Sequence, residues 1–421
     1  MAGARRLGWL LMLLVLPLTV SAVEVSLFSP QGLWPWSPLL PDFEVYWRTG
    51  QLVFAGGDFY HADGMPWLYP PFAALLAAGL AVLPWGLVTV VWVVLDVVAL
   101  MAVLYRLGLS GVRLSIAATV ALVAIAPLRQ ALVLGQVGIL LLAAVVLDVM
   151  PGPRLLRRRI LPEGWLIGVA AAIKLTPALV AVYSFLIGKR AVSWRALGAF
   201  VIATGLGFAI LWGPSVYYWT RLASGDSGVN DGIIYVDNQS VWALWARLSH
   251  ESGLGGAWLG VVVLVLGLVA AVWMYRWGQP RLALVLTGVT SLLASPISWS
   301  HHFVWVVVLL VVVWQERALP TSYRIFALGY GLWVSLAPFW YLPHTEGAEY
   351  HFGAWELAVD NLGIVWGVAL LLASIVVAGR RDGRAFALTR RPANSASTPK
   401  GHPGNSQPAK IVESSELNFV Q

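Results

Sequence analysis

Two aspartates and a histidine lie close together in the stretch AGGDFYHADGMPWLYPPF, residues 55–72. Asp58, His61 and Asp63 all follow an apolar segment and precede a Tyr-Pro-Pro sequence. A carboxylate in such a place can accept a proton from a reacting hydroxyl group. Only 11% of the residues in this chain are charged, so the grouping needs an explanation.

The composition predicts a protein that resides in a lipid bilayer. Of the 421 residues 59% are apolar, and the mean hydropathy is +0.77, whereas soluble domains carry about a quarter charged residues. The net charge of +7 comes from short Lys and Arg clusters at the ends of apolar runs, which is the positive-inside pattern and is untypical of a nucleic-acid surface. The absence of Cys excludes disulfides and thiolate metal sites.

The lengths of the apolar runs predict an all-α polytopic membrane protein with about twelve crossings. The first run, residues 7–23, fits a signal peptide or a retained helix equally well. Residues 69–83 are short for a span and fit a helix in the outer interface. The runs expected to cross are 85–104, 114–127, 131–149, 165–187 broken at Pro177, 197–212, 259–275, 282–297, 304–314, 325–340 and 362–378, with a polar stretch at 213–256.

This topology places both termini in the cytoplasm, together with the RLLRRR cluster of residues 154–159. Residues 380–421 are rich in Ser, Pro, Asn and Lys, which predicts a disordered cytoplasmic tail. Residues 1–379 are therefore expected to form one transmembrane catalytic domain.

The same topology gathers the polar residues of the outer loops on one face. A site at that surface suits a substrate with a polar head and a lipid tail, which calls for a carboxylate as proton acceptor, cations for a phosphate, and amide and aromatic groups for hydroxylated rings. The candidates are Asp42, Asp58, Tyr69, Arg129, Gln136, Lys174, Asn238, Gln239, Trp299, His301 and His302.

Each candidate also has a structural interpretation. Asp58 and Asp42 are both in positions where Asp caps a turn or a helix, Asp42 for an amphipathic helix that ends near Gly56. Lys174 lies in an apolar run, where a cation is costly unless a phosphate offsets it or the side chain reaches the interface. We interpret Lys174 as a phosphate contact and Asp42 as a helix cap and reserve base.

The remaining candidates carry similar alternatives. His301 and His302 are adjacent, so on a helix they point about 100° apart and only one is expected to face a ligand. Arg129 suits a phosphate or a headgroup anchor, and Asn238 and Gln239 suit sugar hydroxyls or loop capping. Trp299 is the aromatic residue chosen to stack on a sugar ring.

Six motifs in order, DFEVYWRTGQLVFAGGDFY, YPPFAALL, GQVG, AAAIKLTP, NQSVWALWAR and SPISWSHH, resemble glycosyltransferase family 87 of the GT-C superfamily. These are actinobacterial mannosyltransferases that use polyprenol-phosphate-mannose. The resemblance covers residues 41–302 and is strongest to members that add an α-1,2-linked mannose to phosphatidylinositol mannosides. It implies a GT-C fold with juxtamembrane helices in the first outer loop, YPPFAALLAAGLAVL being one.

The resemblance also implies roles. Asp58 in GGDFY matches the position of the GT-C catalytic carboxylate, as the general base of an inverting, metal-independent transfer without a cofactor. Donor and acceptor are then a polyprenol-linked mannose and a phosphatidylinositol mannoside, at the periplasmic side of the cell membrane. Alternatives are lipomannan or lipoarabinomannan branching by mannosyl or arabinosyl transfer, and a lipid-linked sugar transporter or flippase, suggested by Asp96 and Asp148 in apolar runs.

Overall fold

The computed structural model describes residues 2–27, 40–225, 232–251, 253–344 and 347–389. These residues form helices and loops, and the only strand-like pairing among them is an isolated bridge between Asn238 and Trp299. The α-helices are α1 (Ala2–Leu27), α2 (Pro41–Ala55), α3 (Pro71–Ala81), α4 (Trp85–Arg106), α5 (Gly111–Ala124), α6 (Ala126–Leu134), α7 (Gly138–Val149), α8 (Trp165–Ile173), α9 (Ala178–Leu186), α10 (Arg190–Ile210), α11 (Trp212–Ala223), α12 (Val241–Ser249), α13 (Leu254–Arg276), α14 (Pro280–Ala294), α15 (Trp305–Gln315), α16 (Thr321–Leu336) and α17 (Ala354–Thr389). Short 3-10 helices are η1 (Ser300–His302), η2 (Pro338–Tyr341) and η3 (Ala348–His351).

The all-helical, membrane-type architecture expected from the sequence is confirmed. Four described helices, α4, α10, α13 and α17, are long and apolar enough to cross a bilayer. A fifth span results if α5 and α6 count as one bent segment, with 82° between them. The other apolar helices are shorter, so the twelve crossings expected from the sequence are not confirmed by helix length.

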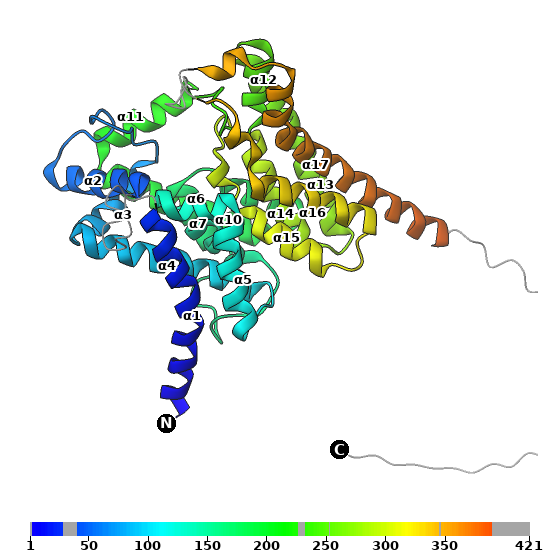
Figure 1. Cartoon of the computed structure of the whole chain (residues 1–421), viewed down its shortest axis with the longest axis horizontal. Helices are drawn as coiled ribbons and strands as arrows, with labels where there is room; N and C mark the ends of the chain where they lie inside the picture. The colour runs from blue at the N-terminus through cyan, green and yellow to red at the C-terminus, as the bar shows by residue number, and fades with distance from the viewer. Residues whose placement is uncertain (1, 28–39, 226–231, 252, 345–346, 390–421) are drawn as a thin grey trace, which may run out of the picture.

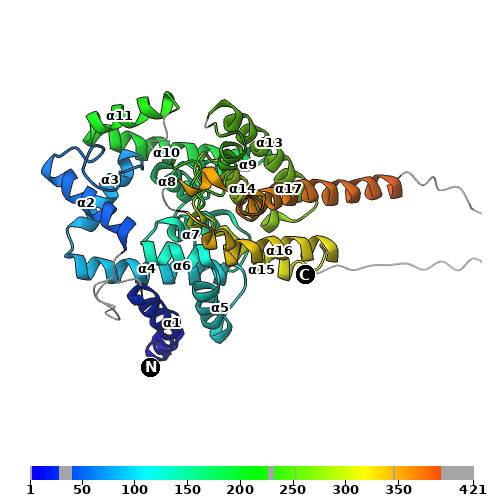
Figure 2. The ribbon, with the colours of Figure 1, turned by 45° about the horizontal axis from the view of Figure 1, so that its top comes forward.

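The helices form a bundle with two distinct ends. Figure 1 shows α11 and α12 at one end and the start of α1 at the other. Figure 2 shows α2, α3 and α11 on one side of the bundle and α13 and α17 on the opposite side. Helix α13 packs on α14 and α17, α2 on α3, α10 on α8, and α1 on α4 and α5.

Two segment predictions were wrong in detail. Residues 131–149 do not form one helix, because α6 ends at Leu134 and Gly135 adopts a left-handed conformation before α7 begins. The polar stretch 213–256 is not a loop throughout, because it contains α12 and all of α11 except its first residue. The break of residues 165–187 at KLTP is confirmed, since α8 ends just before Lys174 and α9 starts after Pro177.

The C-terminal helix extends past the predicted domain boundary. Helix α17 continues to Thr389, whereas the tail was expected to begin at residue 380. The rest of the predicted tail lies outside the described residues.

A close contact between α2 and the α6–α7 junction fixes the geometry of the polar site. Gly135 has a φ of 73°, and a Cβ atom there would lie 2.5 Å from the Cβ of Phe43. Only glycine satisfies both the backbone conformation and the short distance. Gln136, the next residue, is thereby held against the first turn of α2.

Candidate functional site

Asp42 lies in the first turn of α2 and faces the protein interior at half-burial. It is not the cap of this helix as the sequence suggested, because Leu40 occupies the cap position with a φ of 36° and Pro41 begins the helix. The Asp42 carboxylate accepts a hydrogen bond from the Gln136 side-chain amide instead. Its place at a helix N-terminus also favours the ionised form.

Gln136 connects Asp42 to two tyrosines. Its Oε1 accepts hydrogen bonds from the hydroxyls of Tyr46, at 3.1 Å, and Tyr69, at 3.2 Å. The two hydroxyls are themselves 2.8 Å apart. Four polar side chains from α2, from the loop before α3 and from the α6–α7 junction thus form one network.

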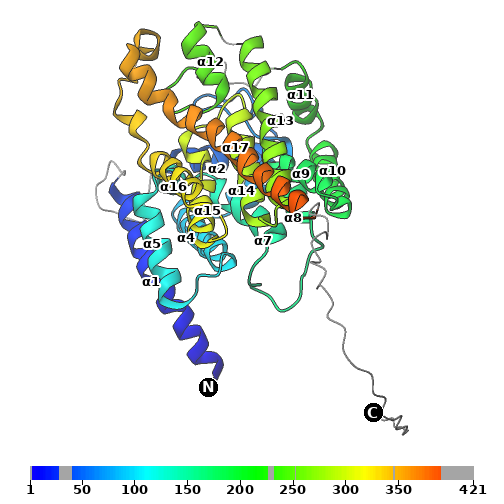
Figure 3. The same cartoon turned by 90° about the vertical axis from the view of Figure 1, so that its right-hand side faces the viewer.

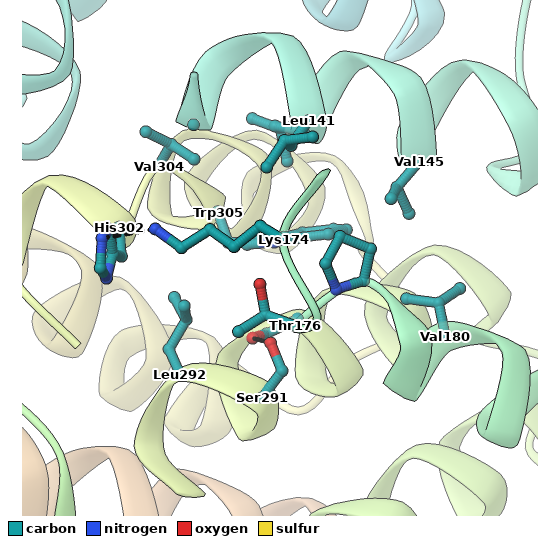
Figure 4. Close-up of a pocket in the computed structure, with 14 residues that line it drawn as sticks. Leu141, Val145, Lys174, Thr176, Val180, Ser291, Leu292, His302, Val304 and Trp305 are labelled. Carbon is teal, nitrogen blue, oxygen red and sulfur yellow. Dashed lines mark hydrogen bonds between the residues drawn. The ribbon is translucent and has the colours of Figure 1, made fainter. Parts of the chain in front are cut away.

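Lys174 and His302 extend the site across the break between α8 and α9. The Lys174 ammonium donates to Nε2 of His302 at 2.7 Å, and Figure 4 shows its side chain extended toward that ring. Its Nζ also lies 5.5 Å from the centre of the Tyr69 ring. An ammonium has three protons, so donors remain for an anionic ligand. We name Asp42, Tyr46, Tyr69, Gln136, Lys174 and His302 the carboxylate–lysine cluster.

The adjacent histidines play different structural parts. They lie on the 3-10 helix η1, with ring planes at 84° and ring centres 4.5 Å apart. His302 contacts Lys174, whereas His301 is buried and its Nε2 has no hydrogen-bond partner among the described residues. This arrangement identifies His302 as the histidine of the cluster.

Asn238 and Gln239 are buried and bonded to the protein itself. Asn238 donates to the carbonyls of Ile233 and Pro296 and accepts from the backbone of Ser298. Gln239 donates to the Val236 carbonyl and to Asp360. Asn238 thus joins the loop before α12 to the loop before η1, and Gln239 joins it to α17.

Arg129 and Trp299 lie outside the carboxylate–lysine cluster in this structure. Arg129 is half-buried on α6, seven residues before Gln136. The Trp299 ring meets Tyr235 edge-on, with ring centres 5.8 Å apart. No hydrogen bond from either side chain to another described residue is present.

Asp58 lies in the turn after α2 and is largely exposed. Its Oδ1 accepts from the backbone amides of Tyr60 and His61, at 3.0 and 3.3 Å, so it caps that turn. Its Oδ2 lies 2.7 Å from Nδ1 of His61. Among the described residues none of its polar contacts is with the carboxylate–lysine cluster.

The two aspartates have opposite electrostatic environments. Burial raises the pKa of Asp42 above its ordinary value, and the Gln136 hydrogen bond and the Lys174 charge oppose that rise. The hydrogen bond with His61 lowers the pKa of Asp58. Asp42 is therefore the stronger base of the two.

Two cavities adjoin α2 near the cluster. A cavity of about 210 Å³ is lined mostly by apolar side chains of α3, α7 and α8, and Tyr46 and Tyr69 also line it. A second, of about 460 Å³, lies between α2 and the following loop and mixes polar with aromatic groups: Glu44, Arg48, Thr49, Gln51, Asp63 and Trp67. Within the described residues no three His, Asp or Glu side chains group as metal ligands would.

Two residues of this region, Tyr46 and Asp237, are not among the site candidates selected from the sequence. Tyr46 lies four residues after Asp42 on the same helix face, a spacing that could have marked it. Asp237 accepts a hydrogen bond from the Ser300 amide at 3.1 Å and so holds the start of η1. Nothing local in the sequence marks that pairing, which joins residues far apart in the chain.

Comparison with known proteins decides the family. Residues 67–296, more than half of the chain, match the model of glycosyltransferase family 87. The chain belongs to this family. The part of this glycosyltransferase that matches the family model includes Gln136, Lys174, Asn238 and Gln239. Asp42 and Asp58 precede the matched residues.

Several curated relatives of this family 87 member carry closely similar names. A polyprenol-phosphate-mannose-dependent alpha-(1-2)-phosphatidylinositol mannoside mannosyltransferase of Mycobacterium tuberculosis is 28% identical over 89% of this chain and 91% of its own length. The protein of the same name from Mycolicibacterium smegmatis is 29% identical over 82% and 85%. A phosphatidylinositol pentamannoside mannosyltransferase of Mycobacterium tuberculosis, with the same donor in its name, is 32% identical over 84% and 86%. The search of solved structures gave no match.

Proposed function

We propose that this glycosyltransferase moves mannose from polyprenol-phosphate-mannose to a phosphatidylinositol mannoside, forming an α-1,2 linkage with inversion at the outer face of the cell membrane. The relatives' names support the donor, the acceptor and the linkage, because the similarity extends over more than four fifths of both chains. The observation that carries the proposal is the carboxylate–lysine cluster, two of whose members, Tyr46 and Tyr69, line an apolar cavity.

The donor fits this arrangement in two parts. The apolar cavity suits a polyprenyl chain, since it offers side chains such as Leu76, Leu80 and Ile173 and almost no polar surface. Lys174 directly follows Ile173 and carries the charge that a phosphate requires. The phosphate accordingly binds at the Lys174 ammonium, and His302 holds that ammonium in position.

The base of the reaction is Asp42 in this proposal. The acceptor's hydroxyl oxygen attacks the anomeric carbon of mannose, Asp42 takes the hydroxyl proton, and the bond from that carbon to the phosphate oxygen breaks. Polyprenyl phosphate leaves as an anion beside Lys174. A single in-line displacement converts a β-linked donor to an α-linked product. Asp42 is favoured because burial strengthens it as a base and because it belongs to the network that reaches Lys174.

Asp58, the base inferred from the sequence, is the second candidate. It lies in the turn after α2, at the opposite end of that helix from Asp42, and has a histidine partner, but its exposure and lowered pKa make it a weaker base. The mixed cavity between α2 and this loop is the acceptor site under either assignment, because its polar groups suit hydroxyls and Trp67 suits a sugar face.

The outward orientation remains part of the proposal, together with cytoplasmic termini and the about twelve crossings of a GT-C protein. It is supported by the basic RLLRRR residues, 154–159. They follow the end of α7, whereas the carboxylate–lysine cluster lies near the start of that helix. Figure 3 shows the loop after α7 toward the lower end of the bundle, with α11 and α12 at the upper end.

The test is transfer of radiolabelled mannose by the purified protein in detergent. With polyprenol-phosphate-mannose and a phosphatidylinositol mannoside, the product should be a larger mannolipid whose new residue an α-1,2-mannosidase removes. Lipomannan as the better acceptor, or transfer only from an arabinose donor, would redirect the substrate assignment. No glycosylated product in detergent, together with movement of the donor across sealed vesicles, would contradict the enzyme proposal.

A further inference from the structure

The loop between α7 and α8 forms a cavity at the end of α7 that lies away from the carboxylate–lysine cluster. Helix α7 starts at Gly138, which contacts the His301 backbone, and ends at Val149. The chain then returns to α8 around a cavity of about 290 Å³. Four arginines line it: Arg106, Arg154, Arg158 and Arg159. We call it the arginine cavity.

Specific hydrogen bonds hold the first part of this loop in place. Arg106 donates to the carbonyls of Gly152 and Pro153, at 3.2 and 3.1 Å, and also to that of Leu147. A Cβ atom on Gly152 would lie 1.9 Å from the Arg106 carbonyl oxygen, so only glycine fits there. The loop is thus closely packed against the end of α4.

Asp148 anchors the second part of the loop. Its carboxylate accepts from the backbone amides of Gly164 and Ile167, at 3.0 and 3.2 Å, and lies 3.4 Å from the Arg159 guanidinium. The cavity is therefore a built feature, with Arg106 and Arg159 used by the protein itself.

The remaining charge around the cavity is unbalanced. Arg154 and Arg158 form no hydrogen bond or ion pair with any described residue. Of the acids near the four guanidinium groups, Asp148 and Glu163 are both engaged by Arg159, Glu163 at 4.0 Å. Positive charges this close repel one another, and a bound anion relieves the repulsion. A guanidinium fork binds phosphate bidentately, which makes phosphate the matching ligand chemistry.

Apolar side chains surround the same cavity. Leu155 and Leu156 are 54% and 55% exposed, and Ile160 is 80% exposed. Apolar residues alternating with arginines are typical of a segment at the membrane interface, with the apolar groups among acyl chains and the cations at the headgroups. Leu166 lines both the arginine cavity and the apolar cavity, so the two cavities lie next to each other.

We propose that the arginine cavity binds the phosphate of an anionic membrane lipid, with Arg154 and Arg158 on the phosphate and the acyl chains along Leu155, Leu156 and Ile160. A basic loop that served only to orient the protein would need no cavity lined by four arginines and would not distinguish lipids with different headgroup charge. The inference does not depend on the substrates proposed above.

The test measures lipid binding by the purified full-length protein in detergent. Native mass spectrometry and thermal unfolding are recorded with phosphatidylglycerol, with phosphatidylcholine and with inorganic phosphate. The variant is Arg154→Gln with Arg158→Gln. The control is Arg113→Gln with Arg195→Gln, two exposed arginines without a hydrogen-bond partner among the described residues.

Phosphatidylglycerol should remain bound to the wild type and the control and raise their unfolding temperatures. The Arg154/Arg158 variant should bind it at least tenfold more weakly, because two charge-assisted contacts are lost. Equal binding of phosphatidylcholine, or equal binding of phosphatidylglycerol by this variant, would overturn the proposal. An unfolding-temperature rise of the same size with inorganic phosphate alone would show a site for free anions and would equally overturn the lipid assignment.

Discussion

Replacement of Lys174 by Met tests the proposed phosphate site with little change in side-chain volume. The substitution removes the ammonium that contacts His302 at 2.7 Å and lies 5.5 Å from the Tyr69 ring. A hydrogen bond between charged groups contributes about 1.5 to 3 kcal/mol, which corresponds to a loss of about 10- to 150-fold in kcat/KM for the donor. The kcat/KM for the donor should fall and that for the acceptor should change little, because the proposed acceptor cavity lies between α2 and the loop that follows it.

The assay titrates donor at saturating acceptor and then acceptor at saturating donor, with transferred mannose as the readout. Lys189→Met is the matched control, since Lys189 lies at the start of α10 and away from the cluster. Both variants should fold, although the free energy of unfolding of Lys174→Met should fall by about 1 kcal/mol because His302 loses its hydrogen-bond donor. A donor kcat/KM within threefold of wild type would refute the phosphate role of Lys174.

Two further predictions concern proton transfer and the α2 contact. A general base works when deprotonated, so activity falls as the pH drops through its pKa. Because burial raises the pKa of Asp42 above 3.8, the acid limb of the kcat/KM profile should lie above pH 3.8. An acid limb below that pH would point to Asp58, whose pKa is lowered. Gly135→Ala places an alanine at a φ of 73° with its Cβ 2.5 Å from the Cβ of Phe43. It should lower the free energy of unfolding, measured by denaturation, by about 2 to 5 kcal/mol. The control Gly79→Ala, at a helix position with open space around it, should leave that free energy unchanged or raise it.

The sequence predicted those features of the fold that depend on local chemistry. Pro177 lacks a backbone donor, so the break between α8 and α9 follows from that residue alone. The break at Gly135 was missed because residues 131–149 read as one apolar run and a glycine within such a run is tolerated. Its left-handed conformation ends α6, and the close approach of Phe43, which leaves no room for a side chain there, involves a residue distant in the sequence.

The sequence listed most members of the carboxylate–lysine cluster among its candidates but not how they are arranged. Asp42, Tyr69, Gln136, Lys174 and His302 were all identified as candidates from their types and positions in the outer loops. Sequence alone could not show that they meet, because they come from five separate segments brought together by helix packing. It also could not separate two aspartates near opposite ends of α2, since the difference between them is burial and hydrogen bonding.

The central claim is that the carboxylate joined to the carboxylate–lysine cluster is the base, and parallel assay of Asp42→Asn and Asp58→Asn tests it most directly. Each change preserves side-chain shape and removes basicity, so mannose transfer by Asp42→Asn should fall at least about 100-fold while donor binding persists. Asp58→Asn should retain activity within a few-fold of wild type. Wild-type turnover by Asp42→Asn, with the loss found in Asp58→Asn instead, would contradict the account.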